Sequence, residues 1–221
     1  MDLHSRRRSG LLRLALTSAL LLLASASAAT TFQATYRAST YQVTSGDSYA
    51  SLLAQHQSGA LIASVPKTSF ENMEPATDAG VVADYSVLFT VDFTSAVSGQ
   101  YLFQAGADWG RGAVAAVIES GTSVIDEFVT TDDVWWNYDF GNPDVISRTV
   151  NITAGNSYTL AWLGFEDCCS GPTSMRFSFE GGAFQALDET NFSAYAAPEP
   201  GTGALVALGL ALLASRSVRR R

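Results

Sequence analysis

Between residues 81 and 93, apolar and polar side chains alternate along the chain with a period of two. One set of alternate positions is polar and consists of Asp84, Ser86, Thr90 and Asp92, with Leu88 as an apolar exception. Successive side chains of a β-strand point to opposite faces of its sheet, so the alternation predicts a strand with one buried face. That face would carry Val81, Ala83, Tyr85, Val87, Phe89, Val91 and Phe93.

Shorter segments with strand character follow one another along the chain, separated by Gly, Ser, Asn and Asp. Two pairs of them flank the turn dipeptides Ser120-Gly121 and Gly155-Asn156, which are hairpin signals. One segment, 49–57, is expected to be helical, with Asp47 as its N-terminal cap. Turns at this spacing predict an all-β fold, an antiparallel β-sandwich or jelly roll. The remaining predicted strands are 31–36, 101–107, 113–118, 123–128, 149–152, 158–165 and 175–179.

Residues 1–28 have the pattern of a secretory signal peptide. A basic region, Arg6 to Arg13, precedes an apolar stretch from Leu14 to Ala24, and Ala26-Ser27-Ala28 is a cleavage pattern of small residues. The apolar stretch would form a helix of roughly 16 Å at 1.5 Å per residue, too short for a hydrocarbon core of about 30 Å. We therefore expect Sec export and cleavage by signal peptidase after Ala28.

The last 24 residues, 198–221, combine three features in order. Pro198-Glu199-Pro200 stops any preceding helix, the run from Ala204 to Ala214 is apolar and free to form a helix, and arginines close the chain. Under the positive-inside bias those arginines would stay cytoplasmic, so export would halt there with the domain outside. The final cluster is Arg219, Arg220 and Arg221.

This tail resembles the PEP-CTERM sorting signal of bacterial envelope proteins. The matching residues are the Pro198-Glu199-Pro200 motif, the apolar run and the terminal arginines. The resemblance implies recognition by an exosortase that cuts near the motif, and an association with extracellular polysaccharide. An ordinary tail anchor after a proline-rich linker is the alternative.

Between these signals the chain is strongly acidic. Residues 29 to 200 carry five Lys and Arg against 20 Asp and Glu, a net charge of −15. Nucleic acid is a poor partner for such a surface, because its binding depends on cationic contacts to phosphate. Divalent cations, cationic groups and neutral sugars remain candidates, beside solubility alone. We expect one acidic β-sandwich domain over 29–180, followed by a flexible spacer over 181–197.

Histidine is scarce, which restricts the chemistry of the domain. Once His4 is removed with the signal peptide, only His56 is left, and it is expected at the surface or half-buried. One histidine cannot build a zinc site of two or three histidines, and no nucleophile-elbow pattern occurs. These features predict a protein that is not an enzyme.

Four strings resemble the core of a protective-antigen-type jelly roll. They are Ser98 to Phe103, Asp108-Trp109-Gly110, Val117 to Gly121 and Ala154 to Leu160. The resemblance implies a jelly-roll fold. In some members of that family two adjacent aspartates in the first turn hold a calcium ion that binds sugar. Here Asp108 keeps the first position, and Trp109 takes the second.

The two cysteines of the chain are neighbours, Cys168 and Cys169. Together with Gly171 they resemble the signature of the Cys-Cys-x-Gly family of PEP-CTERM proteins, a resemblance that implies export and sorting. Export would place the pair in an oxidising compartment. A bond between neighbours is strained, because a trans peptide holds the Cα atoms 3.80 Å apart whereas disulfides usually require 4.4 Å or more. The alternatives are a vicinal disulfide, an interchain link and a free dithiol.

Two groups of side chains are candidate ligand sites. Asp108, Glu166 and Asp167 are a candidate calcium site, since calcium takes six to eight oxygen ligands and backbone carbonyls and waters could complete the shell. Trp135, Trp136 and Tyr138, with acids on either side, could stack against sugar rings. The alternatives are solvated acids on a structural turn and aromatics that cap the core.

Taken together, these features predict an exported, non-catalytic protein of the cell envelope or extracellular matrix. Its membrane anchoring would be transient if the tail is cleaved and retained otherwise. The expected partners are signal peptidase, the Sec machinery, an exosortase and an extracellular polysaccharide. A secreted hydrolase acting on glycans, whose paired carboxylates the sequence could supply, and a simple tail-anchored surface protein are the alternatives.

Overall fold

A computed structural model describes residues 30–169 and 171–197 of the chain. The predicted signal peptide and the predicted sorting tail, with residues Ala26, Ala28, Pro198 to Pro200 and Arg219 to Arg221, lie outside these residues. The structure therefore bears on the domain between the two predicted signals.

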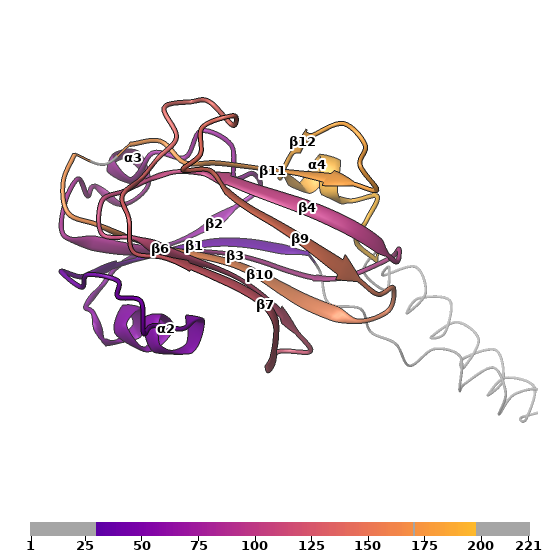
Figure 1. Ribbon diagram of the computed structural model, residues 1–221, viewed down its shortest axis with the longest axis horizontal. Coiled ribbons are helices and arrows are strands. Elements are labelled where there is room, and N and C mark those ends of the chain that lie inside the picture. The colour runs from indigo at the N-terminus through magenta and orange to yellow at the C-terminus, as the bar shows by residue number, and fades with distance from the viewer. Residues whose placement is uncertain (1–29, 170, 198–221) are drawn as a thin grey trace, which may run out of the picture. The chain divides into compact units, whose positions relative to one another are not determined.

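Two antiparallel sheets face each other in this domain (Figure 1). The larger has the order β2-β1-β3-β10-β6-β7, the smaller β12-β11-β4-β9, and β5 pairs with β8 beside them. The predicted all-β antiparallel sandwich is thus confirmed for the described residues. The strands are β1 (Thr31–Ala38), β2 (Leu61–Lys67), β3 (Tyr85–Thr94), β4 (Gly99–Gly106), β5 (Asp108–Trp109), β6 (Ala113–Glu119), β7 (Ser123–Thr130), β8 (Val134–Trp135), β9 (Ile146–Ile152), β10 (Ser157–Glu166), β11 (Ser174–Phe179) and β12 (Gln185–Ala186).

The main core lies between the two sheets, and the side chains that β3 buries in it are those predicted for the buried face. Tyr85, Val87, Phe89, Val91 and Phe93 of β3 are all buried in it. The predicted strand began too early, at Val81, because the backbone turns before β3. Positive φ angles at Gly80 (69°) and Asp84 (53°) prevent an extended chain there.

A second core covers the other face of the larger sheet. The helix α2 (Tyr49–Ser58) lies on this face, away from the smaller sheet (Figure 1). Its N-cap is Ser48, which forms a capping box with Ser51, and not the predicted Asp47. Asp47 instead accepts hydrogen bonds from Thr44 and Ser51 just before the helix. Among the described residues no helix is long and apolar enough to cross a membrane.

His56 is buried under α2, which corrects the expectation of a surface or half-buried residue. Its Nδ1 lies 2.8 Å from the hydroxyl of Ser86 on β3. Both side chains are at most 1% exposed. Burial lowers the pKa of His56 to about 4, so the ring is neutral at physiological pH. The helix buries its last turn against the sheet, where the small Ser86 leaves room for an imidazole.

Residues 181–197 belong to the folded domain, whereas the sequence predicted a flexible spacer. They form β12 and α4 (Glu189–Phe192), and Leu187 and Phe192 are fully buried in the main core. An isolated bridge joins Ala196 to Ser95. The sequence pattern also did not indicate β2, α3 (Pro75–Ala79) or the short strands β5 and β8.

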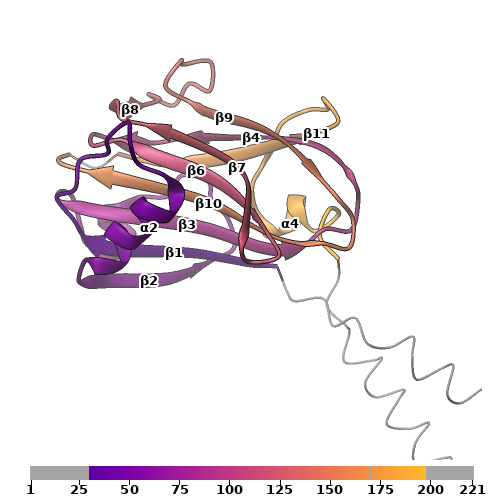
Figure 2. The same cartoon turned by 60° about the horizontal axis from the view of Figure 1, so that its bottom comes forward.

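The chain enters and leaves the described domain at one end of the sandwich (Figure 2). The amide of Ala197 donates to the carbonyl of Thr94 over 2.7 Å, and β1 begins at Thr31 beside the same end of β3. The strand β10 runs from Ser157, paired with Thr94, to Glu166 at the opposite end. A ten-residue strand spans about 30 Å, so the loop after Glu166 is distant from both chain ends.

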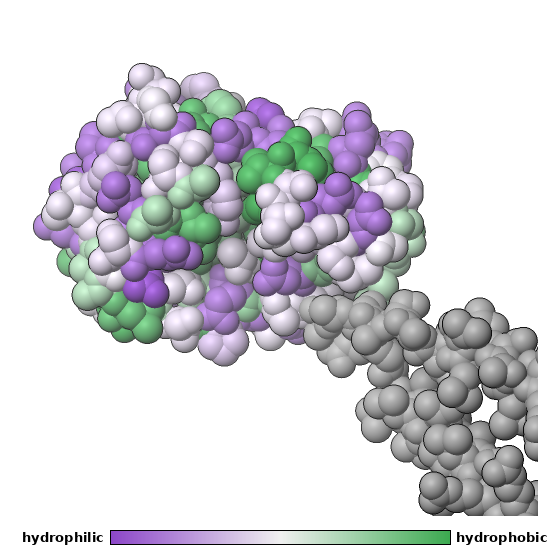
Figure 3. All heavy atoms as spheres, turned by 90° about the horizontal axis from the view of Figure 1, so that it is seen from below, coloured by the Kyte–Doolittle hydropathy of each residue, from purple (hydrophilic) through white to green (hydrophobic). Residues whose placement is uncertain are grey.

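Polar residues dominate the face of the domain seen from below in Figure 1, and the apolar patches on it are separate (Figure 3). The most exposed apolar side chains of the larger sheet lie on its two edge strands. They are Leu61 and Ile62 on β2, and Val124, Ile125 and Phe128 on β7.

One ion pair joins the two sheets where their edge strands β7 and β9 meet. The guanidinium of Arg148 donates to both carboxylate oxygens of Asp126, with Nε at 2.7 Å from Oδ2, and it lies 5.6 Å from the ring of Phe128. The Asp126 side chain is only 16% exposed. A bidentate geometry of this kind requires the planar guanidinium group.

We expect Arg148→Lys to lower the free energy of unfolding by about 1 to 2 kcal/mol, because lysine keeps the charge but loses one of two charge-assisted hydrogen bonds. Urea unfolding at pH 7 measures this loss. Asp84→Asn is the control: it breaks the ion pair with Arg111 at a carboxylate that is 58% exposed, so we expect a change below about 1 kcal/mol. Equal losses in the two variants would show that the Arg148 pair does not hold the sheets together.

Candidate functional site

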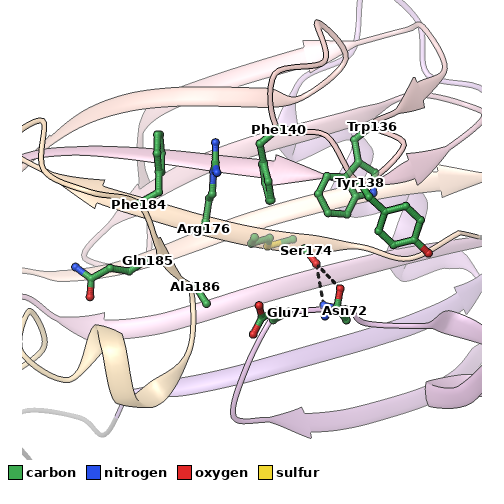
Figure 4. A pocket seen from close by; sticks show the side chains of 11 residues that line it. Glu71, Asn72, Trp136, Tyr138, Phe140, Ser174, Arg176, Phe184, Gln185 and Ala186 are labelled. Atoms are coloured by element: carbon green, nitrogen blue, oxygen red, sulfur yellow. Dashed lines mark hydrogen bonds between the residues drawn. The ribbon is translucent and has the colours of Figure 1, made fainter.

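A cavity of about 340 Å³ opens beside β11 and β12, on the outer side of the smaller sheet (Figure 4). Three segments that are far apart in the sequence line it: the turn before α3, the loop after β8, and the strands β11 and β12. The lining residues are Glu71, Asn72, Trp136, Tyr138, Phe140, Ser174, Met175, Arg176, Phe184, Gln185 and Ala186.

Arg176 is stacked between two phenyl rings in this pocket. Its guanidinium carbon lies 4.0 Å from the ring centroids of both Phe140 and Phe184. Its Nε donates to Gln104 Oε1 over 2.8 Å, and Gln104 in turn donates to Ser147 Oγ over 2.9 Å. Partial burial lowers the pKa of Arg176, and the nearby Asp139 carboxylate partly opposes that shift. The side chain is therefore held in one orientation by contacts on both faces and at Nε.

The loop after β8 supplies one anchoring and one exposed aromatic residue. Trp136 is 4% exposed, and its Nε1 donates to the carbonyl of Pro172 over 3.1 Å. Positive φ angles at Asn137 (49°) and Tyr138 (60°) turn the chain back, and Tyr138 is left 64% exposed while its ring stays 5.5 Å from Trp136. Of the three predicted stacking residues, Trp136 and Tyr138 line the pocket, and Trp135 is exposed outside it.

Polar groups lie at the other side of the pocket. The backbone amide of Asn72 donates to Ser174 Oγ over 2.8 Å, which fixes the turn against β11. Glu71 is exposed, and it is the one carboxylate among the described lining residues. The pocket thus combines aromatic side chains with a carboxylate, an amide and a guanidinium, which is the mixture of apolar and polar groups typical of small-ligand sites.

The three predicted calcium ligands come together at the far end of β10. A Cβ atom added to Gly110 would lie 2.3 Å from Asp167 Oδ1 and 3.4 Å from Glu166 Oε1, and one added to Gly171 would lie 2.3 Å from Asp108 Oδ2. The two glycines therefore leave the space that the carboxylates occupy. Burial, together with the charges of Asp133 and Asp167, raises the pKa of Asp108.

Glu166 has a structural role in this acidic loop. It is 1% exposed, and its carboxylate accepts hydrogen bonds from the backbone amides of Asp167 (3.0 Å), Cys168 (2.9 Å) and Gly110 (3.3 Å). Within the described ranges, no three His, Cys, Asp or Glu side chains are arranged to hold a metal ion. The predicted residues are neighbours, Glu166 is engaged by the backbone amides of the loop, and the calcium site stays a prediction.

The adjacent cysteines lie on the same loop as exposed free thiols. Cys169 has a φ of 70°, which places the turn in the left-handed region. The hydrogen bond with Cys169, burial, and the carboxylates nearby raise the pKa of the Cys168 thiol to about 11. A thiol of that pKa is a poor nucleophile at neutral pH. The vicinal disulfide stays a prediction.

The sequence analysis did not identify Arg176, Phe140 and Phe184 as parts of one site. Phe184 lay in the predicted spacer, and Arg176 appeared only as an outward residue of the predicted last strand. The available signal was a lone basic residue on the outward face of a strand in a very acidic domain. That signal does not indicate which residues contact Arg176, because the two phenylalanines come from a distant loop and from a later turn.

No family model and no curated protein matches the chain. Among solved structures, a PA14 sugar-binding domain from an RTX adhesin is 13% identical over 77% of this chain and 99% of its own, with a TM-score of 0.44. The A domain of Epithelial Adhesin 9 from Candida glabrata, in complex with Galb1-4GlcNAc, is 8% identical over 77% and 90%, with a TM-score of 0.49. The PA14 domain of the antifreeze protein MpAFP is 12% identical over 75% and 88%, with a TM-score of 0.47. Similarities at this level do not establish a shared function.

The pH dependence of stability provides a test of the acidic loop. Burial raises the pKa of Glu166 from its ordinary 4.5 to about 7, against the opposing backbone hydrogen bonds. A raised pKa gives a stabilising contribution that is complete below pH 4.5 and is lost as the pH rises through 7. We expect this loss to be on the order of 3 kcal/mol, and to be absent in Glu166→Gln, whose amide oxygen can still accept from the loop.

Urea unfolding of both proteins at pH 4.5, 6 and 8 measures this difference. Glu71→Gln, which removes an exposed carboxylate without a hydrogen bond, is the control and should follow wild type. If Glu166→Gln and wild type lose stability in parallel across this range, Glu166 does not carry the pH dependence.

Proposed function

We propose that this protein is an exported, non-catalytic binding protein of the cell envelope or extracellular matrix, and that the pocket beside β11 holds a polysaccharide. The observation that supports the proposal is the pocket itself. It places the exposed rings of Tyr138 and Phe184 around a fixed guanidinium, an amide and a carboxylate.

A sugar ring matches this combination of groups. Its CH faces pack on aromatic rings, and its hydroxyls both donate and accept hydrogen bonds. Tyr138 offers an exposed ring, since it is 64% exposed while it rests against Trp136. Glu71 can accept from hydroxyls, and Asn72 and Arg176 can donate to them. Tyr138 rests against the buried Trp136, and Phe184 is stacked on the guanidinium of Arg176, so little ordering is required when a ligand binds.

The arrangement favours binding over glycan hydrolysis. Glycoside hydrolases use two carboxyl groups about 5 to 9.5 Å apart across the scissile bond. Glu71 has no second carboxylate beside it among the described lining residues. The one histidine of the described domain, His56, is buried with Ser86 beneath α2 and away from this pocket. A polysaccharide would therefore be held and not cut.

Export and sorting complete the proposal. The signal peptide over 1–28 and the PEP-CTERM tail over 198–221, with its exosortase, remain parts of it that rest on the sequence. They are compatible with a domain whose two described ends lie together at one end of β3. An anchor that follows residue 197 would leave the opposite end of the sandwich free.

We expect the purified full chain to bind a purified extracellular polysaccharide, and Tyr138→Ala to weaken that binding by about tenfold, because a stacking face is lost. Affinity electrophoresis against a panel that includes polysaccharide of the producing cells measures this. Trp135→Ala is the matched control, since it removes a neighbouring exposed aromatic outside the pocket. Release of reducing ends during the assay would instead indicate a hydrolase. An equal effect of Tyr138→Ala and Trp135→Ala would show that the pocket is not the binding site.

The sorting proposal has its own test. Intact-mass analysis of the native protein, isolated from the producing cells, should give a mature chain that begins after Ala28 and lacks the segment after Pro200. A chain that retains Arg219 to Arg221 would show a simple tail anchor in place of exosortase processing. Pro198→Ala with Pro200→Ala should leave the tail uncut if the motif is what is recognised.

A further inference from the structure

Arg176 differs from every other basic side chain of the described residues in what it binds. Three of the others form salt bridges: Lys67 with Asp78, Arg111 with Asp84, and Arg148 with Asp126. Arg37 donates to the carbonyls of Gln57 and Gly59 at the end of α2. The terminal nitrogens of Arg176 form no hydrogen bond with the described part of the chain, and no carboxylate there lies within 4.0 Å.

Such an unpaired guanidinium is unexpected in so acidic a domain. All Asp and Glu of the chain except Asp2 and Glu199 lie in the described residues. Asp139, whose charge acts on Arg176, uses its carboxylate within its own loop, where Oδ1 accepts from the amide of Gly141 over 2.8 Å. The fold thus holds Arg176 between two rings, apart from partners that the surface has in excess.

The stacking leaves one part of Arg176 available to a ligand. Phe140 and Phe184 cover its two faces, and Gln104 occupies its Nε. Figure 4 shows Arg176 standing between Phe140 and Phe184, and its side chain is partly exposed in the lining of the pocket. A sugar ring cannot stack on Arg176, so a ligand can approach only in the plane of the two terminal nitrogens. Two parallel N–H donors match the two oxygens of a carboxylate.

We infer that Arg176 recognises the carboxylate of an acidic sugar residue within a largely neutral polysaccharide. The inference rests on the proposed function of the pocket and names the ligand class. A hydroxyl could accept from Arg176, but a carboxylate gains a charge-assisted, bidentate contact that is about twice as strong per bond. The net charge of the domain repels a dense polyanion, so the carboxylates of the preferred chain are widely spaced.

The test compares one polysaccharide in two forms. The probe is the extracellular polysaccharide fraction of the producing cells, native and after reduction of its carboxyl groups to alcohols, which leaves the backbone intact. Wild-type protein should bind the native form at least tenfold more tightly. Equal binding of the two forms would overturn the inference and leave the proposed function standing. Binding of neither form would refute the proposed function as well.

Two variants separate recognition from a structural role of the stack. Arg176→Lys keeps the charge and loses the two parallel donors, so it should weaken binding of the native form by about tenfold and leave the reduced form unchanged. If Arg176→Lys weakens binding of the native and the reduced polysaccharide to the same extent, Arg176 only supports the two phenyl rings. A thermal melt of each variant confirms that the domain is folded.

Glu71 gives a test whose sign distinguishes the two kinds of ligand. Glu71→Gln removes a negative charge from the pocket, which favours a carboxylate, whereas the loss of any hydroxyl contact made by Glu71 affects the native and the reduced form alike. The ratio of native to reduced affinity should therefore rise several-fold. Glu74→Gln is the matched control, because it removes the same charge outside the lining. A ratio of native to reduced affinity that Glu71→Gln leaves unchanged or lowers would contradict an acidic ligand.

Discussion

Two tryptophans, Trp109 and Trp136, each pack against a glycine of a neighbouring strand, and these contacts fix the loops on which the rest of the site depends. Trp109 is fully buried, and a Cβ atom on Gly164 of β10 would lie 2.0 Å from its ring. Trp136 lies against Gly106 of β4 in the same way, at 2.2 Å. Any larger residue at either glycine would displace an indole from the space between strand and loop. The two tryptophans are linked by the β5–β8 pairing, so the acidic loop and the aromatic loop are placed together.

The pairing of charges explains why so acidic a domain keeps its structure. Arg148 joins the two sheets through Asp126, Arg111 ties Asp84 to the loop after β5, and Arg37 satisfies carbonyls at the end of α2. Few basic residues are present, and four of the five in the described chain serve such contacts. Arg176 stands apart because aromatic stacking and a neutral amide hold it, and neither satisfies its charge.

The sequence predicted the parts of the fold that depend on local periodicity. β3 buries every second side chain under the opposite sheet, and the alternation of apolar and polar residues was visible along the strand. β6 buries both faces, since Ala113, Ala115 and Val117 face the main core while Val114, Ala116 and Ile118 face α2. Its apolar run still indicated a strand. Residues 181–197 looked like a spacer because their core contacts, Leu187 and Phe192, are separated by polar residues in segments too short for a periodic signal.

The candidate site could be predicted only in part, since it is assembled by tertiary contacts. The segment around Trp136 and Tyr138 was recognisable from its composition, and so were Asp108, Glu166 and Asp167 as acids near turns. Their roles were not, because the pattern cannot tell that Glu166 accepts backbone amides or that Trp135 faces away from the pocket. The stack of Arg176 joins a strand to a residue 36 positions before it and another eight positions after it, which no local pattern reports.

The segment from Gly171 to Ser174 connects the acidic loop to the pocket. Gly171 packs against Asp108, the carbonyl of Pro172 accepts from Trp136, and Thr173 exchanges backbone hydrogen bonds with Met73. Ser174 then accepts from Asn72 at the edge of the pocket. The contact of Gly171 with Asp108 and the bond from Trp136 to Pro172 are made by consecutive residues, so the acidic loop and the anchor of the aromatic loop are tied to one short stretch of backbone. The two ends of this segment cannot be repositioned independently, and the pocket inherits its geometry from the same turn that buries Glu166.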